Sequence, residues 1–246
     1  MEIRGGESNQ FPPYISPQSW LALKAGGRLE TGQIKLINSG LYGDGGTLQA
    51  DVVNLGRCLP GVAAPTAHSF GALNIEGMYI QQGTYVYQNQ TVSSSGKLMI
   101  EVGGYVAGAE HDVLNIDGSF HGGGELVLSL VTGFDPPNGA AFNIITCDRL
   151  IDSFSSLSLP TFIDDRVFVV SYVDMPDGPD LVRARVTTSC PADTNGSDHV
   201  DIEDLGAVIG NWGPCPTGVC PSDINGNSVV DVSDLLMVVN AWGECP

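Results

Sequence analysis

The sequence has little positive charge. Only 10 of its 246 residues are Lys or Arg, against 28 Asp and Glu, and the formal net charge is −18. Such a chain repels phosphate backbones and anionic lipid surfaces, so nucleic acid is excluded as an expected partner. The chain also lacks any run of about 18 apolar residues, which excludes a membrane-spanning helix from the expected fold. Residues 1–17, MEIRGGESNQFPPYISP, contain no apolar signal-peptide core, an absence that by itself favours the cytoplasm.

The cysteines indicate a different compartment. Four of the six stand beside a proline at symmetric positions near the C-terminus, namely Cys190, Cys215, Cys220 and Cys245. This spacing is typical of a disulfide framework that forms under oxidising conditions. We therefore expect a secreted or cell-surface protein whose leader is not visible in this chain.

The same C-terminal segment has no basic residue. From Cys190 to Pro246 there are nine Asp or Glu and no Lys or Arg. Because so many like charges repel one another, we expect this segment to bind a cation.

Short apolar runs dominate the rest of the chain. Residues 1–20 form a polar, proline-containing segment that we expect to be a flexible lead-in. Over residues 21–187, alternating or apolar runs are separated by Gly, Asn and Ser, which predicts strands and turns with no helical period. LNIEG at Leu73 recurs as LNIDG at Leu114, and GKLMIEV at Gly96 is similar to GELVLSL at Gly124. These repeats predict a mainly β domain, a right-handed parallel β-helix or solenoid; a β-sandwich is the alternative.

Part of this domain resembles a known class. The stretch from residue 95 onward, which begins SGKLMIEVGG and continues past FNIIT for about 80 residues in all, resembles the terminal rungs of secreted, autotransporter-like β-helix repeat proteins. The resemblance implies a structural or surface-exposed domain, and it carries no catalytic residues with it.

One segment of the β domain offers groups that could perform catalysis. Its candidate acids and bases are Glu110, His111, Asp112, Asp117, His121 and Glu125. Parallel β-helices include polysaccharide lyases and hydrolases, which use clustered carboxylates. However, the pattern HD.LNIDG follows the structural repeat, and the glycine-rich HGGGEL is read as a turn. We therefore expect no catalytic site.

The C-terminal segment, residues 190–246, is a tandem repeat. CPADTNGSDHVDIEDLGAVIGNWGPCP and CPSDINGNSVVDVSDLLMVVNAWGECP agree at about half of their aligned positions. Each copy begins with the spacing of a calcium loop, in which positions 1, 3, 5, 7, 9 and 12 supply oxygen. The expected ligands to two Ca²⁺ ions are Asp193, Asn195, Ser197, the His199 carbonyl, Asp201 and Asp204, and then Asp223, Asn225, Asn227, the Val229 carbonyl, Asp231 and Asp234.

A helix is expected after each loop. Apolar residues recur with helical spacing at Leu205, Val208, Ile209 and Trp212, and at Leu235, Val238, Val239 and Trp242. The two apolar stripes are predicted to pack on each other. Loop and helix, repeated once, resemble the dockerin module of cellulosome-type assembly systems over residues 193–243.

The dockerin resemblance implies a small all-α module whose calcium loops fold the helices and whose partner is a cohesin domain. It places Ile202, Glu203, Val232 and Ser233, at loop positions 10 and 11, on the contact face. The sequence departs from that pattern in two ways. The best-known dockerins have hydroxyl pairs with nearby Lys or Arg at this face, and they have Gly at loop position 6, where this chain has Asp198 and Ser228. A side chain at position 6 must adopt positive φ, which strains Ser more than Asp.

Two disulfide pairings are open for the repeat. Each copy could pair its own cysteines, or a two-fold relation could join Cys190 to Cys245 and Cys215 to Cys220. Cys58 and Cys147 are expected to be buried free thiols.

Together these features predict a secreted, non-catalytic β-helix protein with a calcium-binding module that attaches it to a cohesin-like partner. The alternatives are a dockerin-bearing polysaccharide lyase or glycoside hydrolase, with a polysaccharide as its substrate, and a surface adhesin.

Overall fold

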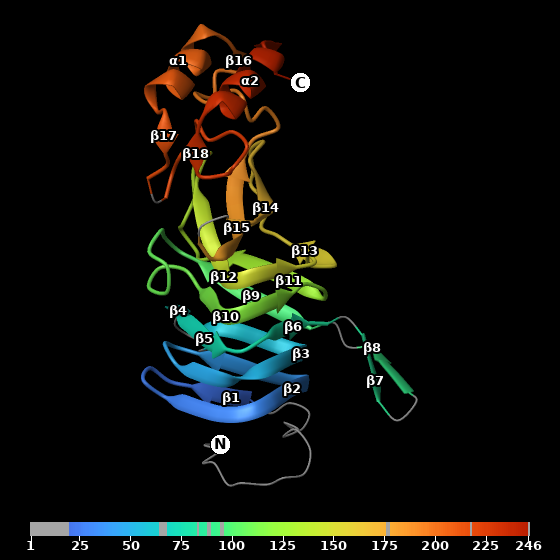
Figure 1. Cartoon of the computed structure of the whole chain (residues 1–246). Coiled ribbons are helices and arrows are strands. Elements are labelled where there is room, and N and C mark those ends of the chain that lie inside the picture. The colour runs from blue at the N-terminus through green and yellow to red at the C-terminus, as the bar shows by residue number, and fades with distance from the viewer. Residues whose placement is uncertain are drawn as a thin grey trace. The chain divides into compact units, whose positions relative to one another are not determined.

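The computed structural model describes residues 20–63, 68–82, 84–87, 90–93, 96–175, 178–216 and 218–245. The predicted lead-in therefore lies outside the described residues except for Trp20, which begins the first strand. The described chain is mainly β, as predicted, with two short helices near the C-terminus (Figure 1). It contains no helix that is long and apolar enough to cross a membrane.

The strands that precede the repeat are, in chain order, β1 (Trp20–Leu23), β2 (Arg28–Gly43), β3 (Thr47–Ala63), β4 (His68–Phe70), β5 (Ala72–Glu76), β6 (Tyr79–Gln81), β7 (Thr84–Tyr87), β8 (Gln90–Ser93), β9 (Lys97–Val102), β10 (Val113–His121), β11 (Glu125–Leu130), β12 (Ala141–Ile151), β13 (Ser156–Ser158), β14 (Val167–Val173) and β15 (Asp180–Thr187). The repeat contains β16 (His199–Val200), α1 (Ile202–Gly210), β17 (Gly213–Pro214), β18 (Val229–Val230), α2 (Val232–Asn240) and β19 (Gly243–Glu244).

The chain forms two compact units. The first contains the described residues up to Phe134 together with Asn143–Leu159 and Asp174–Val182. The second contains Asp135–Phe142, Pro160–Val173 and Arg183–Pro246. The C-terminal repeat, which we call the module, thus shares its unit with β14 and with the end of β15.

Most strands of the first unit stack in parallel (Figure 1), while β4 pairs antiparallel with β3 and β7 with β8. The sequence repeats lie on neighbouring strands in register, because Leu73 of β5 pairs with Leu114 of β10 and Lys97 of β9 pairs with Glu125 of β11. The side chains of Leu73 and Leu114 are fully buried. Each repeated strand therefore buries its apolar residues against its copy, as alternation along the strand allows.

Two features explain why particular repeat residues recur. Asn115 donates to the Asn74 side chain at 2.9 Å and accepts from the Thr146 hydroxyl at 2.9 Å, so a polar ladder crosses three strands. Gly77 and Gly118, which end the LNIEG and LNIDG repeats, have φ of 149° and 144°. A Cβ on Gly118 would lie 2.5 Å from the Gly77 carbonyl oxygen, so only glycine fits this stacked corner.

The module is not all-α, which corrects the prediction. Two antiparallel ladders accompany the helices: β16 pairs with β19, and β17 pairs with β18. In each ladder, two residues at the end of one copy's loop pair with two residues just after the helix of the other copy. Such two-residue ladders leave no alternation in the sequence, so nothing in the sequence predicts them.

Candidate metal centre

The first loop, Asp193–Asp204, folds around the side chain at its first position. Asp193 has only 4% of its surface exposed. Its carboxylate accepts hydrogen bonds from the amides of Gly196 (2.8 Å), Ser197 (3.0 Å) and Asp198 (2.8 Å). These backbone donors hold the chain in a tight ring and stabilise the negative charge of the carboxylate.

The last carboxylate of this loop also starts helix α1. Asp204 has no exposed surface, and it accepts from the Thr194 amide at 2.7 Å and from the Asp201 amide at 2.9 Å. Asp201 in turn accepts from the Glu203 amide at 2.8 Å, within a reciprocal capping box. One buried side chain therefore joins the beginning of the loop to the beginning of the helix.

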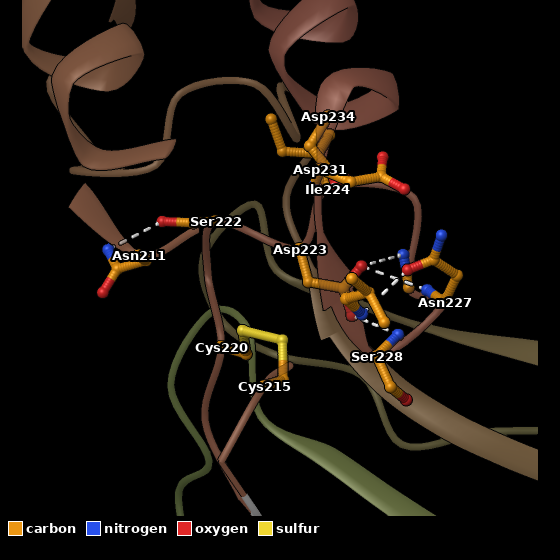
Figure 2. The surroundings of a disulfide bond; sticks show 12 residues. Asn211, Cys215, Cys220, Ser222, Asp223, Ile224, Asn227, Ser228, Asp231 and Asp234 are labelled. Carbon is orange, nitrogen blue, oxygen red and sulfur yellow. Dashed lines mark hydrogen bonds between the residues drawn. A yellow bond between two sulfur atoms is a disulfide. The ribbon is translucent and has the colours of Figure 1, made fainter. Parts of the chain in front are cut away.

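The second loop, Asp223–Asp234, repeats this arrangement (Figure 2). Its first and last carboxylates, on Asp223 and Asp234, are 4% and 0% exposed. The backbone hydrogen bonds to these two side chains come from Gly226 (2.9 Å), Asn227 (3.0 Å), Ser228 (2.9 Å), Asn225 (3.0 Å) and Asp231 (2.9 Å). The two copies of the sequence thus fold into two loops of the same design.

Both loops turn through the left-handed region at positions 4 and 6. The position 6 residues Asp198 and Ser228 have φ of 62° and 77°, the positive values that the sequence predicts there. Glycine occurs at position 4 instead, where Gly196 and Gly226 have φ of 76° and 77°. The loop therefore places its glycine at one of its two left-handed residues and accepts strain at the other.

Two disulfide bonds and the short ladders cross between the copies. Cys190 is bonded to Cys245 and Cys215 to Cys220, with Cα atoms 5.6 Å and 5.9 Å apart. The sequence leaves two pairings open, and the structure has the one that a two-fold relation predicts. Figure 2 shows the Cys215–Cys220 bond beside the second loop. Disulfides of this kind are consistent with an oxidising compartment.

The remaining ligand positions carry oxygen near the surface. The side chains of Asn195, Ser197, Asn225 and Asn227 are exposed, and the His199 carbonyl accepts from the Ser197 hydroxyl at 3.0 Å. Together with the buried carboxylates, they offer only hard oxygen donors, the type that calcium prefers.

The three carboxylates predicted for each calcium site do not by themselves form a cluster that could hold an ion. Among the described residues, no group of three or more His, Cys, Asp and Glu side chains lies close enough together to hold an ion. A calcium loop, however, takes part of its coordination from amide, hydroxyl and backbone carbonyl oxygen. Two buried carboxylates in each loop supply the negative charge that such a cation would neutralise.

No protein-family model, curated protein or solved structure matches this chain. The assignment of the module therefore depends on its residues and their arrangement.

The helices bury only part of the predicted apolar stripes. Val208 and Val238 are fully buried in the core of the module, and Leu205 and Leu235 pack against that core. The predicted burial of the other four residues is wrong: Ile209, Trp212, Val239 and Trp242 are 50–56% exposed. The helices end at Gly210 and Asn240, before either Trp, and Ile209 and Val239 lie one residue beyond the buried valines.

An exposed apolar strip consequently runs along each helix. Ile202 and Ile209 on α1 are 66% and 56% exposed, while Val232, Leu236 and Val239 on α2 are 56%, 52% and 50% exposed. The spacing of these residues places them on one side of each helix. The predicted contact residues Glu203 and Ser233 are also exposed. Sequence reasoning assigned Ile209 and Val239 to the core and passed over Leu236, although the i, i+4, i+7 spacing from Val232 indicates it.

The candidate catalytic residues of the first unit have separate contacts. Asp112 is 3% exposed and accepts from the amides of Gly71 and Glu101, both at 3.0 Å; burial raises the pKa of this carboxyl to about 8. His111 is buried, which lowers its pKa, and its Nδ1 lies 3.1 Å from the Gly104 carbonyl oxygen. The two groups thus contact different backbone groups.

The other candidates also have partners of their own. Glu110 accepts from the amides of Tyr105 and Val106, and Glu125 lies 2.7 Å from the Lys97 amine. His121 lies 3.1 Å from the Ser119 hydroxyl, and Asp117 is exposed. The structure therefore gives these residues different neighbours and does not gather them around one position.

The remaining two cysteines are free and buried, as expected. Burial raises the pKa of the Cys58 thiol to about 12 and that of Cys147 to about 11. Both stay protonated at neutral pH and are poor nucleophiles.

Proposed function

We propose that this chain is a secreted β-helix protein whose dockerin-like module binds two calcium ions and attaches the protein to a cohesin-type partner. The observation that carries the proposal is the pair of buried carboxylates in each loop: the first holds the loop together, and the second joins the loop to the helix behind it.

A β-helix is supported by the register of the first unit. Strands β5, β10 and β12 pair in parallel, and Leu114 lies between Leu73 and Ile145 in that register. The ladder of Asn74, Asn115 and Thr146 adds a polar row beside this apolar one. Repeated rungs that bury the same positions are what a solenoid requires.

Calcium binding is supported by the buried negative charges and the oxygen ligands of each loop. The ligands would be the side chains at positions 1, 3, 5 and 12, the carbonyl at position 7 and a water held by position 9. Bound calcium would supply the positive charge that the module lacks. The buried carboxylates of Asp204 and Asp234 also belong to the capping boxes of the helices. An ion that they ligate would therefore hold the loop and the beginning of the helix together.

Partner docking is supported by the exposed strip on each helix. Ile202 and Val232 begin the two strips, and each stands next to a polar residue at position 11, Glu203 or Ser233. Exposed apolar side chains with acidic neighbours suit a partner that offers an apolar patch with basic groups around it. Because each strip begins at the end of a loop, metal binding and docking would be coupled.

Calcium uptake by the full chain tests the proposal. We expect two ions to bind with a dissociation constant of about 10⁻⁵ to 10⁻³ M, measured by titration calorimetry, with a gain of helical circular dichroism. The variants Asp204→Asn and Asp234→Asn should each lose one ion, because each removes a charge without changing the shape of the side chain. Asp117→Asn, an exposed site in the first unit, is the matched control and should bind two.

Docking is then measured against immobilised cohesin domains with calcium and with a chelator. Ile202→Asp combined with Val232→Asp should abolish capture and leave calcium uptake unchanged. The proposal is wrong if the chain takes up no calcium at about 10 mM, or if Asp204→Asn and Asp234→Asn bind as the control does.

A further inference from the structure

Two buried arginines of the second unit face the second loop. Arg183 and Arg185 lie two residues apart on β15, and therefore on the same side of the strand. They are 7% and 8% exposed. Arginine is seldom buried unless its charge and its N–H groups find partners.

The partners of both side chains belong to the second loop. Arg183 Nη1 donates to the Gly226 carbonyl at 3.1 Å and to the Ser228 hydroxyl. Arg185 Nη1 donates to the Ile224 carbonyl at 2.9 Å. Loop positions 2, 4 and 6 are therefore all held from β15.

The loop's carboxylates also act on these guanidinium groups. Burial lowers the pKa of both, and the charge of Asp223 acts in the opposite direction on each. Asp234 adds to this effect at Arg185. Two of the three carboxylates expected at the second calcium site, Asp223 and Asp234, thus already lie near fixed positive charges.

Within the described part of the chain, no comparable arginine contacts are found at the first loop. The second unit contains three basic residues in its sequence, and the third, Arg166, pairs with Asp135 at 2.9 Å and with Asp164 at 2.8 Å. A Cβ on Gly196 would meet nothing within 4 Å, whereas one on Gly226 would lie 3.6 Å from Arg185 Cδ. The two loops share a design but differ in what covers them.

We propose that Arg183 and Arg185 serve as an internal cation for the second loop, which stays folded without calcium while the first loop folds only when calcium binds. This inference deepens the proposed function and depends on it. The proposal also explains why loop position 6 is Ser228 although its φ is positive. The Ser228 hydroxyl, which glycine would lack, accepts a hydrogen bond from Arg183. The docking strip on α1 is then the calcium-dependent one.

Hydrogen exchange of the full chain, followed by mass spectrometry with and without calcium, tests this proposal. In calcium-free buffer, we expect peptides of the second loop to exchange at least about tenfold more slowly than those of the first loop. Calcium should slow exchange strongly in the first loop and change the second loop less than about threefold.

Arg183→Met combined with Arg185→Met should make both loops equally dependent on calcium, so that added calcium restores protection to the second loop. Arg166→Met, which removes a cation of the same unit away from the loops, is the control and should behave as the wild type does. Restored protection also shows that the double variant folds.

The proposal is overturned if the wild-type loops respond equally to calcium, or if the double variant keeps its calcium-free protection. It is also overturned if calcium fails to restore the second loop in the double variant while still ordering the first, since the arginines would then be structural supports only. If neither wild-type loop responds to calcium, the proposed calcium function is wrong. The role of the arginine contacts is then tested only by comparing hydrogen exchange of the second loop in the wild type and in the double variant without calcium.

Discussion

In the parallel stack of the first unit, β5 and β9 pair with strands that repeat their own sequences, β10 and β11, whereas in the module each half is closed by groups of the other half. Leu73 and Leu114 pair in register and are both fully buried. In the module, Cys190 bonds to Cys245, and β16 pairs with β19 across the repeat.

The difference follows from the core available to each region. The stack buries a large apolar side chain at nearly every inward position, so burial itself stabilises it. The module has a small core of seven buried residues and four fully or nearly fully buried carboxylates, and two disulfide bonds support it. A repeat that stacks can therefore fold without disulfides, while a repeat that folds back on itself requires other support.

The largest expected effect comes from removing the long disulfide. Cys190→Ser with Cys245→Ser opens a ring with a sequence separation of 55 and should destabilise the module by about 4 kcal/mol. Urea denaturation followed by tryptophan fluorescence from Trp212 and Trp242 measures the loss. The transition of the first unit, followed by far-ultraviolet circular dichroism of its strands, should not move. Equal destabilisation of both regions would contradict the view that only the module depends on its disulfide bonds.

A smaller effect is expected in the stack. Asn115→Ala leaves the Asn74 amide oxygen and the Thr146 hydroxyl without their partner, which should cost about 1–3 kcal/mol in the stability of the first unit, and the cost should be the same with and without calcium. Denaturation of the variant is compared with that of Asp117→Ala, an exposed neighbour on the same strand. A cost that depends on calcium would show that the two regions are not independent.

The smallest expected effect, over a single pH unit, is a pH dependence confined to the first unit. The pKa of Asp112 is about 8 in the fold and about 4 in an unfolded chain. The folded state therefore holds a proton that the unfolded state has lost, and stability should fall as pH rises from about 5 to 8, by on the order of 1 kcal/mol for each pH unit.

Asp112→Asn cannot titrate and should remove this slope, whatever its effect on the overall stability. Denaturation midpoints at several pH values, in buffer with saturating calcium, provide the measurement. A slope that persists in Asp112→Asn must come from another group.

Much of the architecture could be predicted because it repeats in the sequence. LNIEG and LNIDG predicted repeated strands, which the structure places side by side as β5 and β10. The duplicated Asp and Asn spacing predicted both loops, the helices that follow them and the positive φ of Asp198 and Ser228. Each of these features depends on local residue types at fixed spacing, which a single sequence displays.

The rest depends on contacts that spacing does not reveal. Ile209 and Val239 fit an apolar helical period, yet the small core of the module accepts one fully buried valine from each helix and leaves them exposed. Arg183 and Arg185 lie in an ordinary strand sequence about 40 residues before the loop that they contact, so their role appears only in the fold.

The Cys190–Cys245 bond has a mechanical consequence. Because the two Cα atoms lie only 5.6 Å apart, tension applied between the chain before Cys190 and the chain after Cys245 passes through the sulfur atoms. The loops and helices between the two cysteines carry none of that load, so stretching the chain along this path does not unfold them.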